Sequence, residues 1–353
     1  MKKFNYENLE KLTLNQEIVN ILLEINKFQS KNDLLSNAKN PVLKKYLKSA
    51  KFNSITTSNQ IEGIKTSNYR MEKIISSPDV KPKNHPESEI IGYKKVLEMI
   101  NDNYENIATI PHHILQLHKI LFSFSFQKQF GYKKIDNFIK ITFPDKTEKT
   151  RFIPSDAYST PQHMEELCQT FNLHFHNPKI NPLIASLNFI LDFLCIHPFT
   201  DGNGRISRLL TTLLLYKNDH IIQKFISFEQ IIEETKESYY DVLFESSQNW
   251  HENQNDPLPF IQYMLNVILQ TYQKMDFNQI QQSSQTALQQ ITNYFNNSII
   301  QTNKATLIKK FPHISPTTIK LYLHKLVKVK YILKVGNGKA TTYIKNPQRN
   351  AIK

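Results

Sequence analysis

Apolar residues recur at a helical spacing through most of the chain, and this pattern predicts a mainly α-helical protein. In the first 130 positions the segments "IVNILLEINKF", "VLKKYLKSAKFNSI", "IIGYKKVLEMI" and "ILQLHKILFSF" carry the pattern. It returns in "PQHMEELCQTFNLHF", "PLIASLNFILDFLCI" and "ISRLLTTLLLYK", where Pro161 and Pro182 stand near the expected helix starts. The chain has 353 residues, which is enough for two or three domains.

Two regions depart from this helical spacing. From Phe138 to Ile153, apolar and polar residues alternate around a polar turn, which predicts a β-hairpin closed by Pro154. From about residue 285, "TLIKKF", "SPTTIKLYLHKLVKV" and "YILKVGNGKATTYIK" predict a short helix, a second helix with Ser315 as N-cap, and a two-stranded wing that turns on "GNGK". This order of elements is typical of a winged helix-turn-helix.

Positive charge is concentrated in the same C-terminal region. The formal net charge is +13, and after Asp276 the chain has twelve Lys and Arg residues but no Asp or Glu. The preceding 276 residues are therefore close to neutral. An argument about a polyanionic partner consequently applies to the C-terminal region alone.

Cysteine content and hydropathy indicate the cellular setting. The longest apolar stretch, "PLIASLNFILDFLCIHPF", is interrupted by Asn188, Asp192 and His197, so it predicts a buried helix and no association with a membrane. Cys168 and Cys195 are the only cysteines, too few for a disulfide framework or a structural zinc site. No apolar run follows the N-terminal lysines, so we expect no secretory signal and a cytoplasmic protein.

The loop "HPFTDGNGR", residues 197–205, joins two of the apolar helices. The first helix must end before Pro198, because the residue before a proline is pushed out of the helical region. Gly202 and Gly204 are two of only seven glycines in the chain. They allow successive backbone N–H groups to form a concave anion site, to which the next helix adds its N-terminal dipole.

Four side chains in this loop or just after it place positive charges, a metal ligand and a base beside that anion site. Arg205 and Arg208 place two cations at a helix N-terminus, which is unfavourable unless a polyanion lies between them. Asp201 supplies a hard oxygen ligand for Mg²⁺ or Mn²⁺ on a polyphosphate, and His197 can take a proton from an incoming hydroxyl. A zinc site on His197 and Asp201 lacks a third donor nearby. The segment therefore predicts phosphoryl or nucleotidyl transfer with direct attack by the substrate, because the loop contains no nucleophile.

At every fixed position, "HPFTDGNGRISR" resembles the Fic motif, H-x-F-x-D/E-G-N-G-R-x-x-R. Fic proteins are mostly AMP transferases, which move the AMP of ATP onto a Ser, Thr or Tyr hydroxyl of a protein and release pyrophosphate. The resemblance implies a mainly α fold with an N-terminal helical region at 1–85, a Fic core at 86–275 that carries the hairpin as a flap, and the winged helix-turn-helix at 285–353. It also implies ATP as substrate and a protein target of unknown identity, with the chain itself as a further target.

The same resemblance assigns roles to residues of the loop. It implies that His197 is the general base and that Asp201 holds Mg²⁺. The phosphate contacts that it implies are Gly202, Asn203, Gly204, Arg205 and Arg208. Doc-like phosphotransferases carry Lys where this sequence has Gly204, and this difference favours AMP transfer.

A second Fic motif lies upstream at Ser58 to Gly63, where "SNQIEG" resembles the inhibitory pattern S/T-x-x-x-E-G/N. A Glu62 carboxylate can form a bidentate pair with Arg208 and occupy the place of the ATP γ-phosphate. ATP would then bind in a pose that cannot react. The motif's position implies the class whose inhibitory helix precedes the Fic core.

Two further sets of contacts are expected from the resemblance. The flap would align a target segment by β-augmentation, with Phe138, Ile139 and Lys140 as its contacts. Adenine or ribose contacts would come from Tyr239, Tyr240 and Trp250. Helical spacing favours core packing for at least two of these three aromatic residues.

The role of the C-terminal module and the direction of the chemistry both remain open at this point. The basic helix and wing are compatible with DNA, although neither carries an arginine, the commonest reader of base edges. Docking of a protein or of a second copy of the chain, giving a homo-oligomer, is the alternative for this module. The alternative functions for the chain are a DNA-binding regulator that uses the Fic core as a nucleotide sensor, and a de-AMPylase in which Glu62 orients a water.

Overall fold

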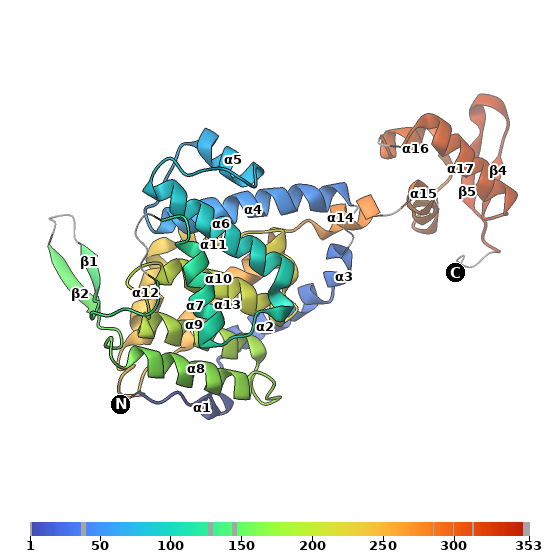
Figure 1. The fold of residues 1–353 in the computed structure, drawn as a ribbon. Coiled ribbons are helices and arrows are strands. Elements are labelled where there is room, and N and C mark those ends of the chain that lie inside the picture. Colours follow the sequence, from blue (N-terminus) through green and yellow to red (C-terminus); the bar gives the residue numbers. More distant parts are fainter. Residues whose placement is uncertain are drawn as a thin grey trace. The chain divides into compact units, whose positions relative to one another are not determined.

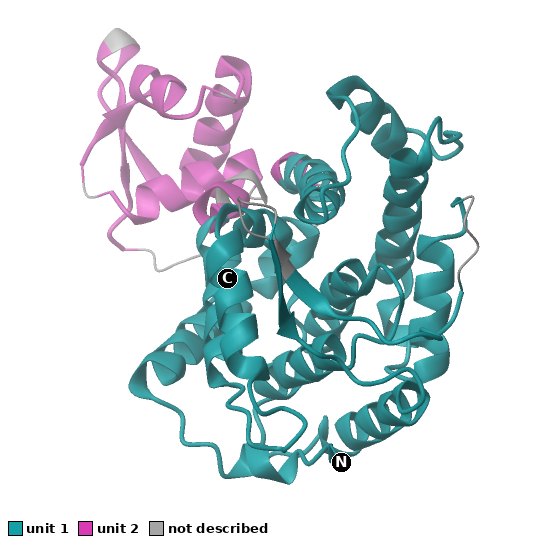
Figure 2. Ribbon diagram, turned by 90° about the vertical axis from the view of Figure 1, so that its left-hand side faces the viewer, with its two compact units in different colours: residues 1–38, 43–275 teal, residues 39–42, 276–353 magenta. Residues whose placement is uncertain are grey.

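The computed structural model describes residues 2–36, 40–125, 130–142, 147–284, 286–298, 300–312 and 314–348. The chain forms two compact units, shown in teal and magenta in Figure 2. Unit 1 comprises residues 1–38 and 43–275, and unit 2 comprises residues 39–42 and 276–353. The fold is mainly α-helical with small antiparallel sheets, as the apolar spacing predicts.

Residues 1–38 and 43–85 belong to unit 1 together with the residues that follow, so the domain boundary expected at residue 85 marks no break between compact units. The helices up to the hairpin are α1 (Glu7–Glu10), α2 (Gln16–Gln29), α3 (Asn32–Leu35), α4 (Pro41–Ile61), α5 (Asn68–Ser76), α6 (His85–Asn103) and α7 (Pro111–Leu121). Those after it are α8 (Thr160–His174), α9 (Pro182–Ile196), α10 (Asn203–Lys217), α11 (Phe228–Glu234), α12 (Lys236–Ser247) and α13 (Leu258–Gln273). Short 3₁₀ turns follow α6 at Tyr104–Asn106 and α10 at Ile221–Lys224.

Helices α9 and α10 form the centre of unit 1 (Figure 1). Helix α9 is apolar on all sides and is buried except at Pro182 and Asn188, because α8, α10, α12 and α13 surround it. Helix α10 packs against both α9 and α6. The segment between α9 and α10 is therefore anchored at both ends in the densest part of the unit.

A close contact between α6 and α7 fixes two residues near that segment. At Gly92 of α6, a Cβ atom would overlap the backbone carbonyl of Leu121 at the end of α7. Only glycine permits this approach without displacing the backbone. The contact holds Glu89 of α6 and His118 of α7 in the part of the core that faces the loop.

Strands β1 (Ile139–Thr142) and β2 (Glu148–Phe152) form the predicted hairpin, which projects from the helical body in Figure 1. They pair antiparallel, with an irregularity in the register between Ile139 and Lys140. Arg151 attaches β2 to α12, because its guanidinium donates hydrogen bonds to the backbone oxygen of Tyr240 at 2.9 Å and to Asp241 at 2.8 Å. Within the described residues, β1 has no strand partner other than β2.

Unit 2 contains α14 (Phe277–Ser284), α15 (Ala287–Asn296), β3 (Thr302–Asn303), α16 (Lys304–Lys310), α17 (Pro316–Lys328), β4 (Ile332–Val335) and β5 (Thr342–Lys345). Ser315 caps α17 by accepting a hydrogen bond from the N–H of Thr318, as expected. The three strands form an antiparallel sheet in the order β3-β5-β4. The sheet therefore has one strand more than the predicted two-stranded wing, because the short β3 gives no periodic signal in the sequence. Among the described residues, no helix in either unit is long and apolar enough to cross a membrane.

Candidate active site

The loop between α9 and α10 reverses the chain in six residues, from His197 to Gly202. His197 ends α9 in the left-handed region, with φ of 50°, and Gly202 begins α10 with φ of 83°. A left-handed histidine is uncommon and requires support from its surroundings. This support is a set of side-chain hydrogen bonds to the loop backbone, from Lys133 and Asn137 outside the Fic motif and from Asn203 within it.

Lys133 and Asn137 hold the first half of the loop. The buried Lys133 ammonium donates hydrogen bonds to the backbone oxygen of Ile196 at 3.1 Å and to Asn137 at 2.8 Å. Asn137 in turn donates to the backbone oxygens of His197 at 3.4 Å and Phe199 at 3.1 Å. Together they satisfy carbonyls that would otherwise lack partners at the end of a buried helix. Sequence reasoning missed both residues, because a lysine in a polar segment carries no signal of burial.

His197 is held in the form that a general base needs. Its Nδ1–H donates to the backbone oxygen of Leu194 at 3.3 Å, which leaves Nε2 as the basic nitrogen. Burial, aided by the charge of Lys133, lowers the pKa of His197 to about 4. The ring is therefore neutral at pH 7 and can accept a proton.

Asp201 and Asn203 shape the second half of the loop. Asp201 has an exposed side chain, and its Oδ1 accepts a hydrogen bond from the N–H of Gly202 at 2.5 Å. Asn203 is buried, and its side chain bonds both the N–H and the carbonyl of Phe199, at 2.9 and 2.7 Å. The side chain of Asn203 therefore fixes the loop, and only its backbone N–H remains for an anion.

Asp201 is the loop's only carboxylate, and its exposure fits a hard divalent cation. Among the described residues, no cluster of three or more His, Cys, Asp or Glu side chains could hold a metal ion. A cation at Asp201 would therefore need phosphate oxygens and water as its other ligands. This arrangement is usual for Mg²⁺ bound together with a nucleotide, so the residues fit the expected ion.

The two arginines of α10 lie in different environments. Arg205 is only 1% exposed, and its guanidinium lies 2.5 Å from Glu89 of α6 and 3.7 Å from Asp201. It also lies over the ring of Phe122, 5.3 Å from the centroid. Glu89 was not expected from the sequence. In this state Arg205 is paired with carboxylates, and its expected contact with a phosphate stays a prediction.

Arg208 binds the Ser58–Gly63 motif, whose serine and glutamate lie on α4 and at its end. Its Nη2 donates to Glu62 Oε1 at 2.7 Å and to the backbone oxygen of Ser58 at 2.9 Å, and its Nε donates to Ser58 Oγ at 2.8 Å. The expected pairing of Glu62 with Arg208 is therefore present. Within the described residues it is a single hydrogen bond and not a bidentate pair, and Ser58 accepts two further hydrogen bonds from the same guanidinium.

The Glu62 carboxylate is charged and in part accessible. Burial raises its pKa, but the nearby positive charges of Arg208, Arg205 and Lys236 together hold it below the ordinary value. Its side chain remains 32% exposed. Gly204 gives the carboxylate room, because a Cβ at position 204 would overlap Glu62 Oε1.

The C-terminus of α4 is built to present Glu62. Gly63 has φ of 77°, and the N–H groups of Gly63 and Ile64 bond the carbonyls of Gln60 and Asn59 at 2.9 Å each. This is a Schellman motif, which requires a left-handed residue and therefore favours glycine at position 63. Lys236 of α12 donates to the backbone oxygen of Ile61 at 2.7 Å and closes the same helix end.

One turn earlier on α4 than Ser58, Ser54 attaches the helix to a buried carboxylate. Glu229 of α11 is 1% exposed and accepts hydrogen bonds from Ser54 Oγ at 2.7 Å, from Tyr93 at 3.1 Å and from Ser227 at 2.7 Å. A buried carboxylate without these donors would be costly. The network therefore fixes the position of α4 along the core, and with it the distance from Glu62 to Arg208.

The three aromatic residues expected to contact the nucleoside lie in different places. Trp250 is fully buried and donates its indole N–H to Asp192 at 2.7 Å, so the prediction that it contacts the nucleoside is wrong. Tyr239 is 4% exposed and packs against Phe260 and Tyr263. Of the three, Tyr240 alone is half-buried. Core packing thus accounts for two of them, as their helical spacing favours.

The flap residues are accessible. Phe138 is 54% exposed just before β1, Ile139 is half-buried, and Lys140 is exposed and pairs with Glu148 across the hairpin at 2.7 Å. Among the described residues, their side chains form no hydrogen bond or ion pair with the loop between α9 and α10, and positions 143–146 lie outside the described residues. Their predicted contact with a target segment remains a prediction.

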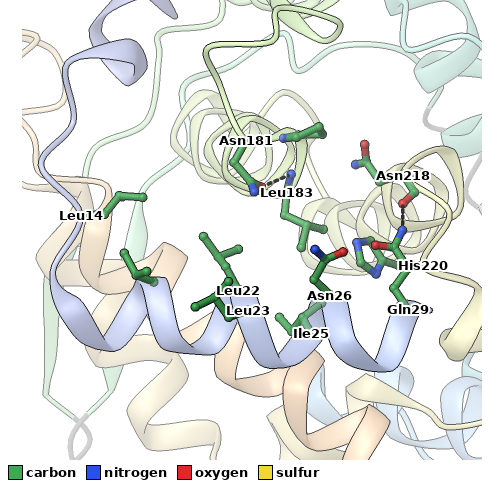
Figure 3. A pocket seen from close by; sticks show the side chains of 12 residues that line it. Leu14, Leu22, Leu23, Ile25, Asn26, Gln29, Asn181, Leu183, Asn218 and His220 are labelled. Carbon is green, nitrogen blue, oxygen red and sulfur yellow. Dashed lines mark hydrogen bonds between the residues drawn. The ribbon is translucent and has the colours of Figure 1, made fainter. Parts of the chain in front are cut away.

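A cavity of about 600 Å³ adjoins the loop at Thr200 and Asp201 and is also lined by His85, His118 and Lys134. A second cavity, of about 510 Å³, lies away from the loop, between α2, the start of α9 and the residues that follow the end of α10. Figure 3 shows it, with Leu22 and Ile25 on α2 facing Asn181, Asn218 and His220. It contains no residue of either motif, so the cavity at Asp201 is the one that belongs to the candidate site.

Buried neutral histidines predict a loss of stability in mild acid. Burial lowers the pKa of His118 and of His220 to about 4. The unfolded chain takes up these protons near pH 6.5, so stability is fully present above that pH and falls as the pH falls to about 4, by about 3 kcal/mol for each residue. Thermal unfolding between pH 8 and 4 measures the effect. The variant His220→Gln should flatten the curve and the exposed-site variant His112→Gln should not, whereas a midpoint independent of pH would contradict the prediction.

Comparison with known proteins identifies residues 108–215 as a match to the Fic/DOC family. A Fido domain-containing protein from Dictyostelium discoideum is 33% identical over 73 residues, which is 20% of this chain. The chain spans about half the length of that relative, since the match covers 51% of it.

Solved structures agree with the fold. A Fic family protein from Desulfovibrio desulfuricans G20 is 20% identical with a TM-score of 0.60, covering 96% of this chain and 99% of that one. A Fic domain containing signaling protein from Bacteroides thetaiotaomicron VPI-5482 is 19% identical with a TM-score of 0.58, covering 74% and 96%. A fragment of Fic-1 from C. elegans is 18% identical with a TM-score of 0.53, covering 76% and 74%. At these identities the likeness establishes the fold alone.

Proposed function

Residues 108–215 match the Fic/DOC family, and from this match we propose that the chain is a self-inhibited protein adenylyltransferase. The observation that carries the proposal is the ion pair between Glu62 and Arg208, at 2.7 Å. It joins residues 146 positions apart and places a carboxylate beside a complete Fic motif. Arg208 is the residue to which the motif assigns a phosphate of ATP.

In the proposed reaction, a Ser, Thr or Tyr hydroxyl of a protein attacks the α-phosphorus of ATP. The new O–P bond forms as the bond to pyrophosphate breaks, and the hydroxyl proton passes to Nε2 of His197. The neutral ring and the Nδ1–H bond to Leu194 support this role. Backbone N–H groups at the start of α10 hold phosphate oxygens. Mg²⁺ held by Asp201 would neutralise charge on the phosphates.

Inhibition follows from the position of the Glu62 carboxylate. It occupies a donor of Arg208 that a γ-phosphate needs, and two negative groups cannot share that site without repulsion. Because the side chain is 32% exposed at the end of α4, a rotation of that side chain releases Arg208 without unfolding the helix. The inactive state is therefore one that a partner or a change in conformation can reverse.

The position of the radioactive label in ATP tests the proposed chemistry. Relative to the same lysate without added enzyme, whose own kinases use the γ-phosphate, the released variant Glu62→Gly should add protein label from [α-³²P]ATP and none from [γ-³²P]ATP. Label from the γ position alone would show phosphotransfer and contradict the proposal. Release of AMP from a modified protein by the wild type, lost in Glu62→Gly, would instead support the reverse reaction, de-AMPylation.

The target protein, with the chain itself as one candidate, and the Mg²⁺ dependence belong to the same proposal. We also place the protein in the cytoplasm, because the two cysteines, Cys168 and Cys195, are both buried free thiols.

A further inference from the structure

Unit 2 has its own hydrophobic core, which fixes the direction in which each face of α17 points. The core residues on α17 are Ile319, Leu323 and Leu326, and they pack against Ile291 and Phe295 of α15. The opposite face of the helix is exposed. It comprises Thr317, Lys320, Leu321, His324 and Lys328, and we call it the outer face of α17.

Positive charge surrounds this outer face and is not neutralised locally. No Asp or Glu follows Asp276 in the sequence. The exposed lysines of the described part of unit 2 lie at the end of α16, along and just after α17, and on β4: Lys309, Lys310, Lys320, Lys325, Lys328, Lys330 and Lys334. None of them forms a salt bridge with a described residue. Such a surface attracts a polyanion, and the attraction weakens with salt.

Shape and apolar character narrow the choice of polyanion. Leu321 is 62% exposed at the middle of the outer face, between Lys320 and His324. A single helix of this kind fits the major groove of duplex DNA, where a leucine can contact a thymine methyl group while flanking lysines reach phosphates. The major groove of duplex RNA is too narrow for this contact. An acidic protein would complement the positive charge of the outer face of α17, but it would not explain the exposed leucine at the middle of that face.

We propose that unit 2 binds duplex DNA, with the outer face of α17 in the major groove and the lysines of α17 and β4 on the phosphates. This inference is independent of the proposed transfer reaction. The element order α15, β3, α16, α17, β4, β5 is that of a winged helix, in which the β4–β5 hairpin lies beside the recognition helix. Because no arginine lies on the outer face, affinity should depend mainly on phosphates, with modest sequence preference.

The test measures binding of the full-length protein to a fluorescent 24-base-pair duplex by anisotropy at 50 to 300 mM KCl. With about four to six phosphate contacts, the affinity should fall with a slope of about −4 to −5 in log K against log salt. The double variant Lys320→Ala/Lys328→Ala should reduce that slope by about 2. The matched control Lys44→Ala/Lys119→Ala removes two exposed lysines of unit 1 and should leave the slope unchanged.

A second variant separates the apolar contact from the charge. Leu321→Ala should weaken DNA binding by a similar factor at every salt concentration without changing the slope. Because Leu321 is exposed, its replacement should leave the fold intact, and circular dichroism and thermal unfolding of the variant check this. Sedimentation of the same variants reports their oligomeric state.

Four outcomes would overturn the proposal. They are no binding to the duplex at 50 mM KCl, an equal effect of the control pair, tighter binding to duplex RNA than to DNA, and a change in oligomeric state on Leu321→Ala with DNA binding unaltered. The last result would instead assign the outer face to contacts between copies of the chain.

Discussion

Replacing Glu62 by glycine is expected to raise AMP transfer to protein by at least about tenfold. The substitution removes the carboxylate that pairs with Arg208 at 2.7 Å and leaves the guanidinium available to the γ-phosphate. A hydrogen bond between charged groups contributes about 1.5–3 kcal/mol, and the partial exposure of Glu62 favours the lower end, which corresponds to a factor of about ten. The measurement is the initial rate of protein labelling by [α-³²P]ATP for variant and wild type at equal concentration.

A matched control tests whether removing an acidic side chain from a helix end is by itself enough to raise the labelling rate. Glu10 ends α1 in an ion pair with Lys179 at 3.5 Å, so Glu10→Gly alters a similar paired helix terminus whose described partners, Lys179 and Asn177, belong to neither motif. That variant should label at the wild-type rate. Equal rates for Glu62→Gly and the wild type, with both proteins folded, would show that the Glu62–Arg208 pair does not inhibit.

Replacing His197 by alanine in the Glu62→Gly protein is expected to lower AMP transfer by about 10²–10⁴-fold. This is the usual loss when a positioned general base is removed. The neutral ring, the Nδ1–H bond to Leu194 and the location beside the anion site all support that role. Binding of ATP should change little, because His197 is not among the residues expected to hold phosphates. Labelling rates and ATP affinity, measured separately, distinguish loss of the base from loss of the nucleotide.

The pH profile gives an independent check on His197. Its pKa of about 4 means that the neutral base is present above that pH and is lost as the pH falls through it. Removing Glu62 also removes a negative charge that raises the His197 pKa, so the pKa in the released variant should be lower still. Labelling by Glu62→Gly should therefore show no loss of a histidine base between pH 8 and 5.5. A drop centred near pH 6.5 would mean that the base is solvated or that a different histidine is used.

Much of the candidate site could be predicted from the sequence because its parts are contiguous. His197 to Arg208 lie within twelve positions, so the motif fixes which residues face the same point. Pro198 and Gly202 set the ends of α9 and α10 by local backbone constraints, and Ser315 caps α17 for the same reason. The spacing of Ser58 and Glu62, four residues apart, places both on one face of α4.

Other features depend on partners far apart in the chain, and no local pattern reports them. Arg205 meets Glu89, Lys133 meets the end of α9, and Lys236 closes α4. The burial of Trp250 also depends on a distant partner, because the buried Asp192 accepts its indole N–H and the core covers its ring. An aromatic residue on a helix has the same sequence signature whether it lines a cavity or fills a core.

The sequence by itself determined the loop that carries the Fic motif, the Ser58–Gly63 motif, the helical class and the separate basic C-terminal region. These depend on rules that act over a few residues: helix periodicity, backbone constraints at proline and glycine, and the spacing of charges. Only the tertiary structure decided that Arg208 binds Glu62 through one hydrogen bond and Ser58 through two, and that Arg205 pairs with both Glu89 and Asp201. The physical reason is that a buried charge must find its partner wherever packing brings one within reach, and packing is set by the whole chain.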